Sequence, residues 1–512
     1  MNLVTLLDTQ AGTRPEQTAI IDGKSGHERS ISFRRFQSLS AAIAERMARE
    51  GIGTGSRVLI LIPMRAELYA TLSAIWRLGA TALFLDPSAG LKHVARCCES
   101  AKADALVGVP KARILAWISR PLRKIPRKLY WGSALKWDAI PNRPAKALPV
   151  PPTHPAILTF TSGSTGQPKG AIRTHGVLKA QYEALQTAIA LEAGEVDMAT
   201  MPVIALVNLA AGLTTFIPDV NLARPGFIKA ISLLGQVERI KPNRSGASPA
   251  FFLRLCEEAQ RQGKALPFFD KIYTGGAPVF PRSLRNYQKT FTRASINVLY
   301  GSTEAEPISH ISLREIAARD LEAMKNGEGL LVGTVSQETE LRILRDSWGQ
   351  NLLHLKDSAF DELTLGNKET GEIVVSGNHV VPGYLDGQGD AENKIHARGK
   401  IWHRTGDAGY IDAQGRLWLL GRCSAKFQIE GKTIYPFAIE CAAVEHFDVS
   451  IAGCVESGNG YTLVLPAAKK DADLSTFYSR IPSARETRFL KAIPLDKRHN
   501  AKINYAALKK RV

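Results

Sequence analysis

One stretch determines how the remainder of the chain is interpreted: Leu158-Thr159-Phe160-Thr161-Ser162-Gly163-Ser164-Thr165-Gly166-Gln167-Pro168-Lys169-Gly170. It starts apolar and β-prone, continues with hydroxyl residues and glycines, and closes with a lysine. A strand can deliver such a segment, glycine lets the backbone approach an anion closely, and N–H and O–H groups can point at that anion. The stretch predicts a phosphate-binding loop, and a Ser/Gly surface turn is the simpler alternative.

The spacing of this loop differs from that of the P-loop nucleotide hydrolases. Lys169 follows a proline, and no G-K-[ST] sequence closes the loop. We therefore expect a phosphate loop that does not open a helix of the P-loop type. A kinase-like or P-loop ATPase function does not fit this pattern.

Length and composition limit the class of protein. With 512 residues the chain is too long for a single hydrophobic core, so two or more domains are expected. Its 45% hydrophobic and 22% charged residues are typical of a globular protein. The apolar runs are too short to span a membrane, and residues 1–8 lack the basic region of a secretory signal. The 6 cysteines form no C-x-x-C pair, which predicts free thiols in a reducing cytoplasm.

A basic segment, Lys111–Lys128, contributes to the formal net charge of +18. It contains seven lysines and arginines and no acid, with Trp117, Leu122 and Ile125 interleaved. Such a segment suits an anionic membrane surface, a partner enzyme of the same pathway, or solvent alone, and these alternatives stay open. Because no nucleic-acid motif accompanies the segment, no nucleic-acid partner is expected.

Helix and strand patterns alternate over residues 1–345. Phe36, Leu39, Ile43 and Met47 recur at helical spacing, and Arg57–Ile62 reads as a buried strand. This alternation predicts parallel sheets with helices on their faces. Two later strands, Lys271–Gly275 and Ile296–Tyr300, each run into a turn of small residues, and such turns gather at the carboxyl edge of a parallel sheet, where ligands bind. Residues 245–249 are interpreted as a turn before a helix over 250–260.

The later part of the chain has a different secondary-structure pattern. Residues 346–420 contain short strands with turns, which predicts a small β-rich subdomain. From Arg422 onward, short β and α pieces follow one another. The predicted fold class is therefore α/β, with a large N-terminal domain of parallel-rich sheets and flanking helices, a small β-rich subdomain, and a small α+β C-terminal domain.

Several motifs occur in one fixed order along nearly the whole chain. They are Thr161–Gly170, Tyr300–Glu304, Gly371–Tyr384, Arg404–Asp407, Gly421-Arg422 and Lys502. In these motifs the chain resembles the acyl-adenylate-forming (AMP-binding) superfamily, which includes acyl-CoA synthetases, luciferases and adenylation domains. Within it, the chain is most similar to the olefin β-lactone synthetases and the fatty acyl-CoA ligases. That nearer likeness is carried by Met201–Asn208, Trp402–Arg404 and Arg498–Ile503.

The resemblance implies a reaction and a nucleotide site. A carboxylate attacks the α-phosphate of ATP to give an acyl-adenylate, so catalysis is mostly positioning and electrostatic stabilisation. Thr303 is implied at the α-phosphate, and Glu304 with Thr165 at Mg²⁺. The β- and γ-phosphates are assigned to the loop residues Thr161, Ser162, Gly163, Ser164, Thr165, Gly166 and Lys169.

The resemblance also implies contacts to the nucleoside and a moving domain. Tyr300 is implied to stack on adenine, along which Gly275, Gly276 and Ala277 would lie. A carboxylate has the acceptors for a diol, so Asp407 suits the ribose, with Arg422 at the same sugar. Lys502 is implied to reach the α-phosphate and the carboxylate. It would belong to a mobile lid domain, residues 422–512, that closes on an AMP-binding domain, residues 1–421, about a hinge near Ser424.

The chain departs from the family pattern at three positions. Ser424 stands where the family usually has a hinge Asp or Lys, and Ala205 replaces an aromatic residue or His, which leaves room for a branched acyl chain. Glu430 lies where a positive or neutral residue is common in CoA-using relatives, which weakens the case for CoA. By resemblance, the acyl pocket is lined by Val203, Ala205, Leu206, Asn208 and, in the 246–249 segment, Ser248.

Three functions remain as alternatives. In one, a β-hydroxyl of the substrate itself attacks the adenylate and gives a β-lactone and AMP; in another, CoA attacks and an acyl-CoA is released. Ala205, Ser424 and the Arg498–Ile503 match favour the lactone, with a 2-alkyl-3-hydroxy acid as substrate. A non-catalytic nucleotide- or acyl-binding protein is the third alternative, but Lys502 and Glu304 are both present.

Overall fold

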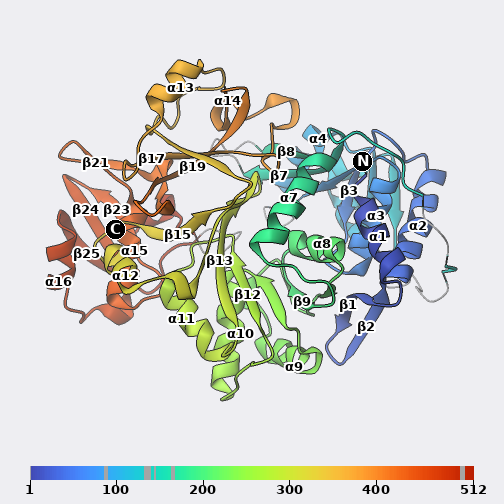
Figure 1. Cartoon of the computed structure of the whole chain (residues 1–512), viewed down its shortest axis with the longest axis horizontal. Coiled ribbons are helices and arrows are strands. Elements are labelled where there is room, and N and C mark those ends of the chain that lie inside the picture. The colour runs from blue at the N-terminus through green and yellow to red at the C-terminus, as the bar shows by residue number, and fades with distance from the viewer. Residues whose placement is uncertain (1, 86–89, 132–139, 143–145, 163–167, 496–501) are drawn as a thin grey trace. The chain divides into compact units, whose positions relative to one another are not determined.

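A computed structural model describes residues 2–85, 90–131, 140–142, 146–162, 168–495 and 502–512 (Figure 1). The chain forms two compact units: the first comprises residues 1–247 and 378–389, and the second comprises residues 248–377 and 390–512. Within the described ranges, every helix is too short or too polar to cross a membrane.

The first unit contains a six-stranded sheet in the order β6-β5-β3-β4-β7-β8. All of its strands run parallel except β8, which is antiparallel to β7. The strands are β3 (Arg57–Leu61), β4 (Thr81–Phe84), β5 (Ala105–Gly108), β6 (Arg127–Tyr130), β7 (Pro155–Ser162) and β8 (Pro168–Thr174). Their connections include α3 (Ala66–Arg77), α4 (Leu91–Ala101), α5 (Ala112–Ile118) and α6 (Arg120–Lys124). The predicted parallel sheet with helical connections is thus confirmed.

A second group of strands in the same unit has the order β11-β9-β10-β1-β2. Its first four strands are parallel, and β2 pairs antiparallel with β1. The strands are β1 (Thr18–Lys24), β2 (His27–Ser32), β9 (Val196–Ala199), β10 (Thr214–Phe216) and β11 (Arg244–Ala247). The helices are α1 (Val4–Thr13), α2 (Phe33–Arg49), α7 (His175–Ala188), α8 (Pro202–Ala211), η3 (Pro225–Phe227) and α9 (Ala230–Ile240).

Helix α2 shows why the sequence folds locally as predicted. Its apolar residues at helical spacing, Phe36, Leu39, Ile43 and Met47, are all buried. The side chain of Ser32 caps the helix by accepting a hydrogen bond from the backbone N–H of Arg35. Amphipathic spacing and a cap agree here, so local sequence was sufficient.

The turn expected over residues 245–249 is wrong, because residues 245–247 belong to the buried strand β11. Arg244 holds this strand against β9 through a buried ion pair with Asp197, with Nε and Oδ2 2.8 Å apart. The small residues that suggested a turn serve packing instead. A β-carbon at Gly246 would lie 3.1 Å from the side chain of Ile204 in α8.

Residues 378–389 return to the first unit after strands of the second. Tyr384 forms an isolated antiparallel bridge with Ala171 of β8, and Leu385 of η5 (Leu385–Gly387) joins the core that contains Leu158 and Phe160. The motif Gly371–Tyr384, which is continuous in sequence, is therefore divided between the two units.

The second unit is built on a mostly antiparallel group of strands in the order β16-β17-β19-β20-β15-β14-β13-β12. Strands β12 and β13 are parallel, and β18 pairs with β19. The strands are β12 (Lys271–Gly275), β13 (Ser295–Ser302), β14 (Ala305–Ser312), β15 (Leu330–Val335), β16 (Glu340–Leu344), β17 (Gly371–Ser376), β18 (Lys394–Ala397), β19 (Lys400–Ile411) and β20 (Arg416–Arg422). The helices are α10 (Pro249–Arg261), α11 (Pro281–Thr290), η4 (Leu313–Glu315), α12 (Ala318–Lys325), α13 (Asp357–Leu363) and α14 (Asp390–Asn393). The predicted β-rich character of residues 346–420 is confirmed.

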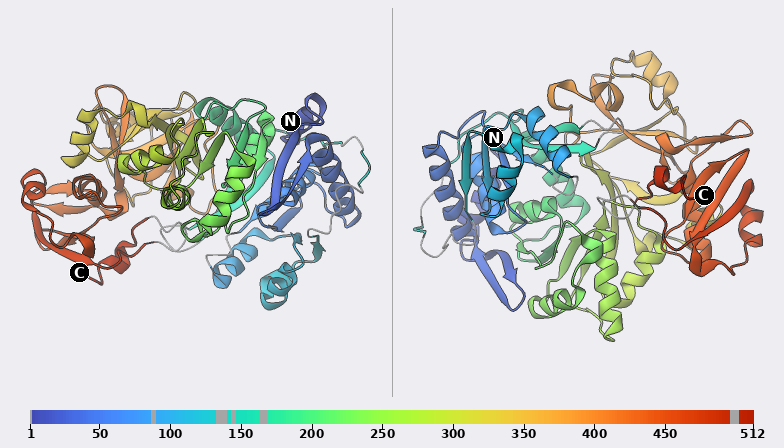
Figure 2. Two further views of the ribbon diagram at one scale, coloured as in Figure 1. Left: turned by 90° about the horizontal axis from the view of Figure 1, so that it is seen from below. Right: turned by 180° about the vertical axis from the view of Figure 1, so that it is seen from behind.

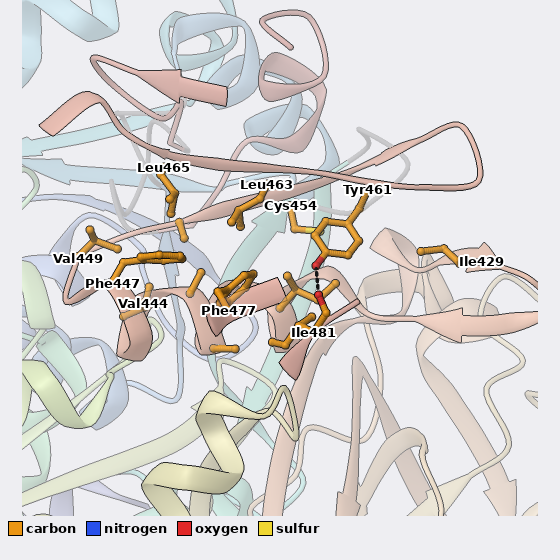
Figure 3. Close-up of a cluster of buried hydrophobic side chains, with 14 of the residues drawn as sticks. Ile429, Val444, Phe447, Val449, Cys454, Tyr461, Leu463, Leu465, Phe477 and Ile481 are labelled. Atoms are coloured by element: carbon orange, nitrogen blue, oxygen red, sulfur yellow. Dashed lines mark hydrogen bonds between the residues drawn. The ribbon is translucent and has the colours of Figure 1, made fainter. Parts of the chain in front are cut away.

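The C-terminal part of the second unit has a core of its own (Figure 3). Phe447 and Phe477 pack with ring centroids 5.1 Å apart, and the hydroxyl of Tyr461 donates to the carbonyl oxygen of Ile481 at 2.9 Å. The strands are β21 (Phe427–Ile429), β22 (Lys432–Ile434), β23 (Gly453–Ser457), β24 (Gly460–Pro466) and β25 (Ala484–Leu490). The helices are η6 (Cys423–Ala425), α15 (Pro436–Phe447), η7 (Ala467–Lys469), α16 (Ser475–Arg480) and α17 (Tyr505–Leu508). The α/β fold class and the α+β C-terminal part are confirmed, and the domain boundary at residue 421 stays a prediction.

A buried carboxyl group links three elements of this C-terminal part. Glu440 of α15 accepts a hydrogen bond from the backbone N–H of Cys454 at 3.0 Å through Oε1, and from the hydroxyl of Tyr505 at 3.0 Å through Oε2. Burial raises the pKa of Glu440 to about 8, against the opposing effect of the two hydrogen bonds. Glu440 therefore ties β23 and α17 to α15 and keeps its proton at neutral pH.

Glu440→Gln should flatten the pH dependence of stability. The unfolded carboxyl group releases its proton near pH 4.5, whereas the folded one releases it at about pH 8. The stabilisation from the protonated Glu440 is therefore complete below the unfolded pKa and is lost as the pH rises through the folded pKa, by at most about 1.4 kcal/mol per pH unit. We expect the Tm of the native protein, measured by calorimetry between about pH 5 and pH 9, to fall more than that of the variant.

The matched control is Glu456→Gln, because Glu456 is an exposed carboxylate on β23 of the same part. This control should retain the pH slope of the native protein. Equal slopes for the native protein and Glu440→Gln would show that Glu440 is ionised in the fold.

Candidate nucleotide and acyl site

The predicted phosphate loop connects two antiparallel strands of the first unit. Thr161 and Ser162 end β7 and pair with Lys169 and Pro168 at the start of β8. A strand, and not a helix, follows the loop, as the missing G-K-[ST] sequence led us to expect. Gly163, Ser164, Thr165 and Gly166 lie outside the described residues.

Lys169 lies close to a glycine that sequence reasoning did not single out. Its side chain is 6% exposed, and a β-carbon at Gly389 would lie 2.5 Å from its Cδ. Gly389 also has a φ of +109°, a backbone conformation that residues other than glycine rarely adopt. The backbone at Gly389 thus packs directly against the aliphatic stem of Lys169.

In the second unit, Thr303 and Glu304 form the tip of a hairpin. Strand β13 ends at Ser302, which pairs with Ala305 at the start of β14. Glu304 is 9% exposed and Thr303 is half-buried. The hairpin therefore presents a hydroxyl group and a largely buried carboxylate side by side.

A buried lysine lies in the electrostatic environment of Glu304. Lys394 of β18 is fully buried; burial lowers its pKa to about 8, while negative charge on Glu304 and Asp390 opposes that shift. Its pairing partner on β19 is His403, whose pKa is well below the usual value because of burial and the positive charge of Lys394. The site thus contains a cation and a neutral imidazole. The sequence assigned neither residue a role: His403 lies in the stretch Trp402–Arg404 that carried the nearer likeness, whereas no motif marks Lys394 and lysine is rarely buried.

Asp407 unites three predicted nucleoside residues in one hydrogen-bonded group. Its Oδ2 accepts a hydrogen bond from the hydroxyl of Tyr300 at 2.8 Å, and its Oδ1 lies 3.1 Å from Nε of Arg422. Asp407 and Arg422 are paired positions on β19 and β20. The hydroxyl of Thr405 accepts from the backbone N–H of Asp407 at 3.0 Å, which positions the carboxylate further.

The charges in this group support one another. Burial, and then the negative charge of Asp407, raises the pKa of Tyr300 well above its usual value, so its hydroxyl stays protonated and donates. The charge of Asp407 raises the pKa of Arg422. Because a carboxylate offers about four acceptor positions, Asp407 keeps acceptors for a diol after both contacts.

The predicted adenine-side turn follows β12. A β-carbon at Gly275 would lie 2.5 Å from the carbonyl oxygen of Leu299 on the neighbouring strand, and Gly276 has a φ of +80°. Ala277 is half-buried beyond them. Glycine at position 275 is therefore required by strand pairing, whatever its contact with a ligand.

The predicted acyl-pocket residues of α8 lie on two faces of that helix. Val203 and Leu206 line a cavity of about 20 Å³ together with Leu3, Leu7 and Trp76. Ala205 and Asn208 are fully buried on the other face, since helical periodicity separates them from Val203 by more than 120°. Ser248 immediately precedes α10 at the start of the second unit. The structure thus brings Val203 and Leu206 together and does not place Ala205 or Asn208 with them.

Asn208 is an unusual buried residue. It is 0% exposed, and neither its amide oxygen nor its amide nitrogen has a hydrogen-bond partner in the described part of the chain. An unpaired buried polar group typically costs about 1–3 kcal/mol, so such a group calls for an explanation.

Lys502 is exposed, and the residues that follow it are held by contacts within the C-terminal part. Ile503 bridges to Leu495, and Asn504 caps α17 by accepting from the backbone N–H of Ala507 at 3.0 Å. Tyr505 is bound to Glu440, as described above. Arg498–Ala501, the start of this motif, lie outside the described residues. Ser424 lies in η6, and Glu430 has a φ of +49° in the turn between β21 and β22.

The residues fit a magnesium nucleotide. Among the residues that the structure describes, no group of three or more His, Cys, Asp or Glu side chains could form a complete metal site. Mg²⁺ commonly binds through one or two carboxylates, with phosphate oxygens and waters completing its octahedron. The carboxylate of Glu304 is therefore sufficient as a protein ligand, and Thr165 lies outside the described residues.

Comparisons with known sequences identify the family of the chain. A family profile described as AMP-binding enzyme matches residues 7–385. The chain is similar to an olefin beta-lactone synthetase of Stenotrophomonas maltophilia (strain K279a), with 31% identity over 98% of this chain and 96% of the relative. It is 22% identical to 4-coumarate–CoA ligase 2 of Oryza sativa subsp. japonica, over 95% of this chain and 88% of the relative.

Solved structures support the fold. The amide bond synthetase McbA from Marinactinospora thermotolerans matches with a TM-score of 0.79 and 21% identity, covering 99% of both chains. The O-succinylbenzoate coenzyme A synthetase MenE from Bacillus subtilis, in complex with ATP and magnesium ion, matches with a TM-score of 0.75 and 21% identity, covering 98% of this chain and 99% of that one.

Asp407→Asn should weaken ATP binding. The amide keeps the shape of the side chain but loses the charge that pairs with Arg422 and one acceptor for a diol. Hydrogen bonds to charged groups contribute about 1.5–3 kcal/mol, so Kd should rise by about ten- to 150-fold in titration calorimetry. Asp361→Asn is the control, because Asp361 is a half-exposed carboxylate in α13. An unchanged Kd for Asp407→Asn would show that Asp407 does not contact the nucleotide.

Proposed function

Because the chain belongs to the AMP-binding enzyme family, as an acyl-adenylate-forming ligase that uses ATP, we propose that its substrate is a fatty-type 2-alkyl-3-hydroxy acid and its product a β-lactone. The observation that carries the proposal is the 31% identity with an olefin beta-lactone synthetase over 98% of this chain. The identity with the CoA ligase reported above is lower, at 22%.

The proposed reaction has two steps. First, a carboxylate oxygen of the substrate attacks the α-phosphorus of ATP, and the bond to the pyrophosphate oxygen breaks. Second, the β-hydroxyl oxygen attacks the acyl carbon, the bond to the AMP oxygen breaks, and the hydroxyl proton is released. The balance is acid plus ATP giving β-lactone, AMP and pyrophosphate. The second step is intramolecular and needs no second substrate.

Each residue has a defined task in this scheme. Asp407 and Arg422 hold the ribose, with Tyr300 at the adenine. Thr303 binds the α-phosphate, and Lys502 binds the α-phosphate and the carboxylate. Bound at Glu304, Mg²⁺ neutralises phosphate charge. In the first unit, Lys169 and the loop that begins after Ser162 serve the β- and γ-phosphates.

Asn208 supports a hydroxylated substrate. Its buried amide has no partner among the described residues, whereas its neighbour on the same helix face, Ala205, offers no polar atom. Asn208 is fully buried on the face of α8 away from Val203 and Leu206, so in this proposal the bound acid opens that face. A substrate hydroxyl that then reaches Asn208 would recover the cost of the unpaired amide. A plain alkyl chain would leave that amide unsatisfied, which favours the 3-hydroxy acid over its deoxy analogue.

A cleft in the second unit is large, but its charge does not favour CoA as a second substrate. The cleft encloses about 1310 Å³ and includes the stacked rings of Tyr410 and Trp418. Several of its cations are already neutralised. Arg416 pairs with Asp320, Lys426 with Asp346, and Arg480 with Glu322, at 2.8, 2.7 and 2.8 Å. The lining also holds Arg345, Lys368 and Lys432 and the acids Glu328, Asp412 and Glu430, so the phosphates of CoA would meet charge of both signs.

The fate of the adenylate can be tested with a pair of acids. We expect a 2-alkyl-3-hydroxy acid with ATP and Mg²⁺ to give pyrophosphate, AMP and a β-lactone by mass spectrometry, with or without CoA. The matching 2-alkyl acid without the hydroxyl should give the adenylate but no lactone. Formation of an acyl-CoA in place of the lactone would establish the CoA ligase, and the absence of pyrophosphate release with every acid would contradict the ligase class.

Lys502→Ala should abolish most pyrophosphate release.

Asn208→Leu should separate recognition of the hydroxyl from the chemistry of activation. Leucine is close to asparagine in size and has no polar atom, so kcat/KM for the 3-hydroxy acid should fall by about 5- to 150-fold, the equivalent of about 1–3 kcal/mol. The value for the deoxy acid, measured by pyrophosphate release, should stay the same or rise. An equal fall for both acids would indicate a purely structural role for Asn208.

A further inference from the structure

An apolar stripe projects from the first unit on helix α5. Ile114, Trp117 and Ile118 are 63%, 73% and 57% exposed, and they lie at positions i, i+3 and i+4 of one helix face. In the left view of Figure 2, the light-blue segment that carries α4, α5 and α6 lies at the lower edge of the first unit. Large apolar side chains that gather on one exposed face mark an interaction surface.

The opposite side of the same helices is firmly packed. Ala112 and Ala116 of α5 are buried, and Ala116 joins Leu122 and Ile125 in the core cluster that also contains Leu106 of β5. The stripe is therefore held outward by a packed inner face. Its exposure is not the result of an unfolded segment.

Positive charge borders the stripe. Lys111, Arg120, Arg123 and Lys124 are exposed, and none of them forms an ion pair with the part of the chain that the structure describes. Residues 111–128 contain no acid. Arg113 stacks over Tyr130 at 4.9 Å, and Lys128 donates to the carbonyl oxygens of Arg123 and Ile125, so these two cations are engaged locally. Among the side chains that the structure describes in the adjacent helix α4, Arg96 is an exposed cation and Glu99 an exposed acid.

We propose that this α5–α6 surface docks on an anionic lipid membrane. The combination of an apolar helix face with flanking lysines and arginines matches the requirements of the interface, where apolar side chains enter the boundary and cations meet anionic headgroups. Tryptophan favours this boundary because its ring is amphipathic. A nucleic acid would bind the cations, but it would leave the apolar side chains of Ile114 and Ile118 without an apolar partner. The proposal does not depend on the lactone product, because it concerns a surface and not the site.

Sedimentation with vesicles tests the proposal. Full-length protein is mixed with vesicles of phosphatidylcholine containing about 30 mol% phosphatidylglycerol, and with vesicles of phosphatidylcholine alone. We expect at least about tenfold stronger partitioning onto the anionic vesicles, reduced at about 0.5 M salt because the charges are screened. Equal binding to both vesicles, or binding to neither, would overturn the proposal.

Two variants separate the apolar from the basic contribution. A triple variant, Ile114→Ser with Trp117→Ser and Ile118→Ser, should lose about tenfold or more in partitioning. Arg120→Gln with Arg123→Gln and Lys124→Gln should lose the preference for anionic lipid. Phe227→Ser is the control, since Phe227 is 73% exposed as well but lies in η3.

The control variant and measurements in solution distinguish membrane docking from unspecific adhesion and from dimer formation. All variants change exposed residues, so pyrophosphate release in solution and circular dichroism should match the native protein. If Phe227→Ser loses as much binding as the triple variant, adhesion is unspecific and the proposal fails. If the triple variant keeps its vesicle binding but dissociates a native dimer in light scattering, the surface serves a second copy of the chain, and the proposal fails.

Discussion

The contacts of the Asp407 carboxylate are the interactions on which the described part of the proposed nucleotide site depends. It lies on β19 and binds Tyr300 of β13 and Arg422 of β20, at 2.8 and 3.1 Å. A charged group removed from water needs such partners, and each partner here comes from a different strand. The contact therefore sets the relative positions of three strand segments. Strand β13 runs directly into the hairpin that carries Thr303 and Glu304, so this hairpin is attached to the same network.

Charge compensation explains how a carboxylate is tolerated at that hairpin. Glu304 is 9% exposed, and its charge interacts with those of Lys394 and Arg422. Both cations come from strands that pair with β19. The charge of Glu304 is thus compensated by positive charge that the protein itself supplies. Arg404 serves structure in the same region, because it is fully buried and pairs with Glu372 at 2.6 Å.

The predicted acyl-pocket residues come from one motif, but the motif does not reveal which of their side chains face the same way. The apolar stretch Met201–Asn208 contains no alternation that distinguishes strand from helix. The helix α8 begins with Pro202 at its first position and ends at Gly212, which has a φ of +79°. Once the segment is helical, its side chains divide between two faces: Val203 and Leu206 line one cavity, and Ala205 and Asn208 lie on the other face. The resemblance supplied the residues, whereas the helical period decided which of them face the same way.

The sequence by itself determined the α/β class, the helix over residues 33–49 and the absence of a P-loop helix after Lys169, and it supplied the predicted site residues, because periodicity, caps and motifs are local signals. Tertiary structure alone decided that Tyr300, Asp407 and Arg422 form one hydrogen-bonded group, that Lys394 is buried near Glu304, and that residues 245–247 form a strand. It also decided that Trp117 faces solvent while Ala116 is buried. These outcomes depend on burial and on contacts between residues far apart in the chain, and no local pattern encodes the free energy of removing a particular side chain from water.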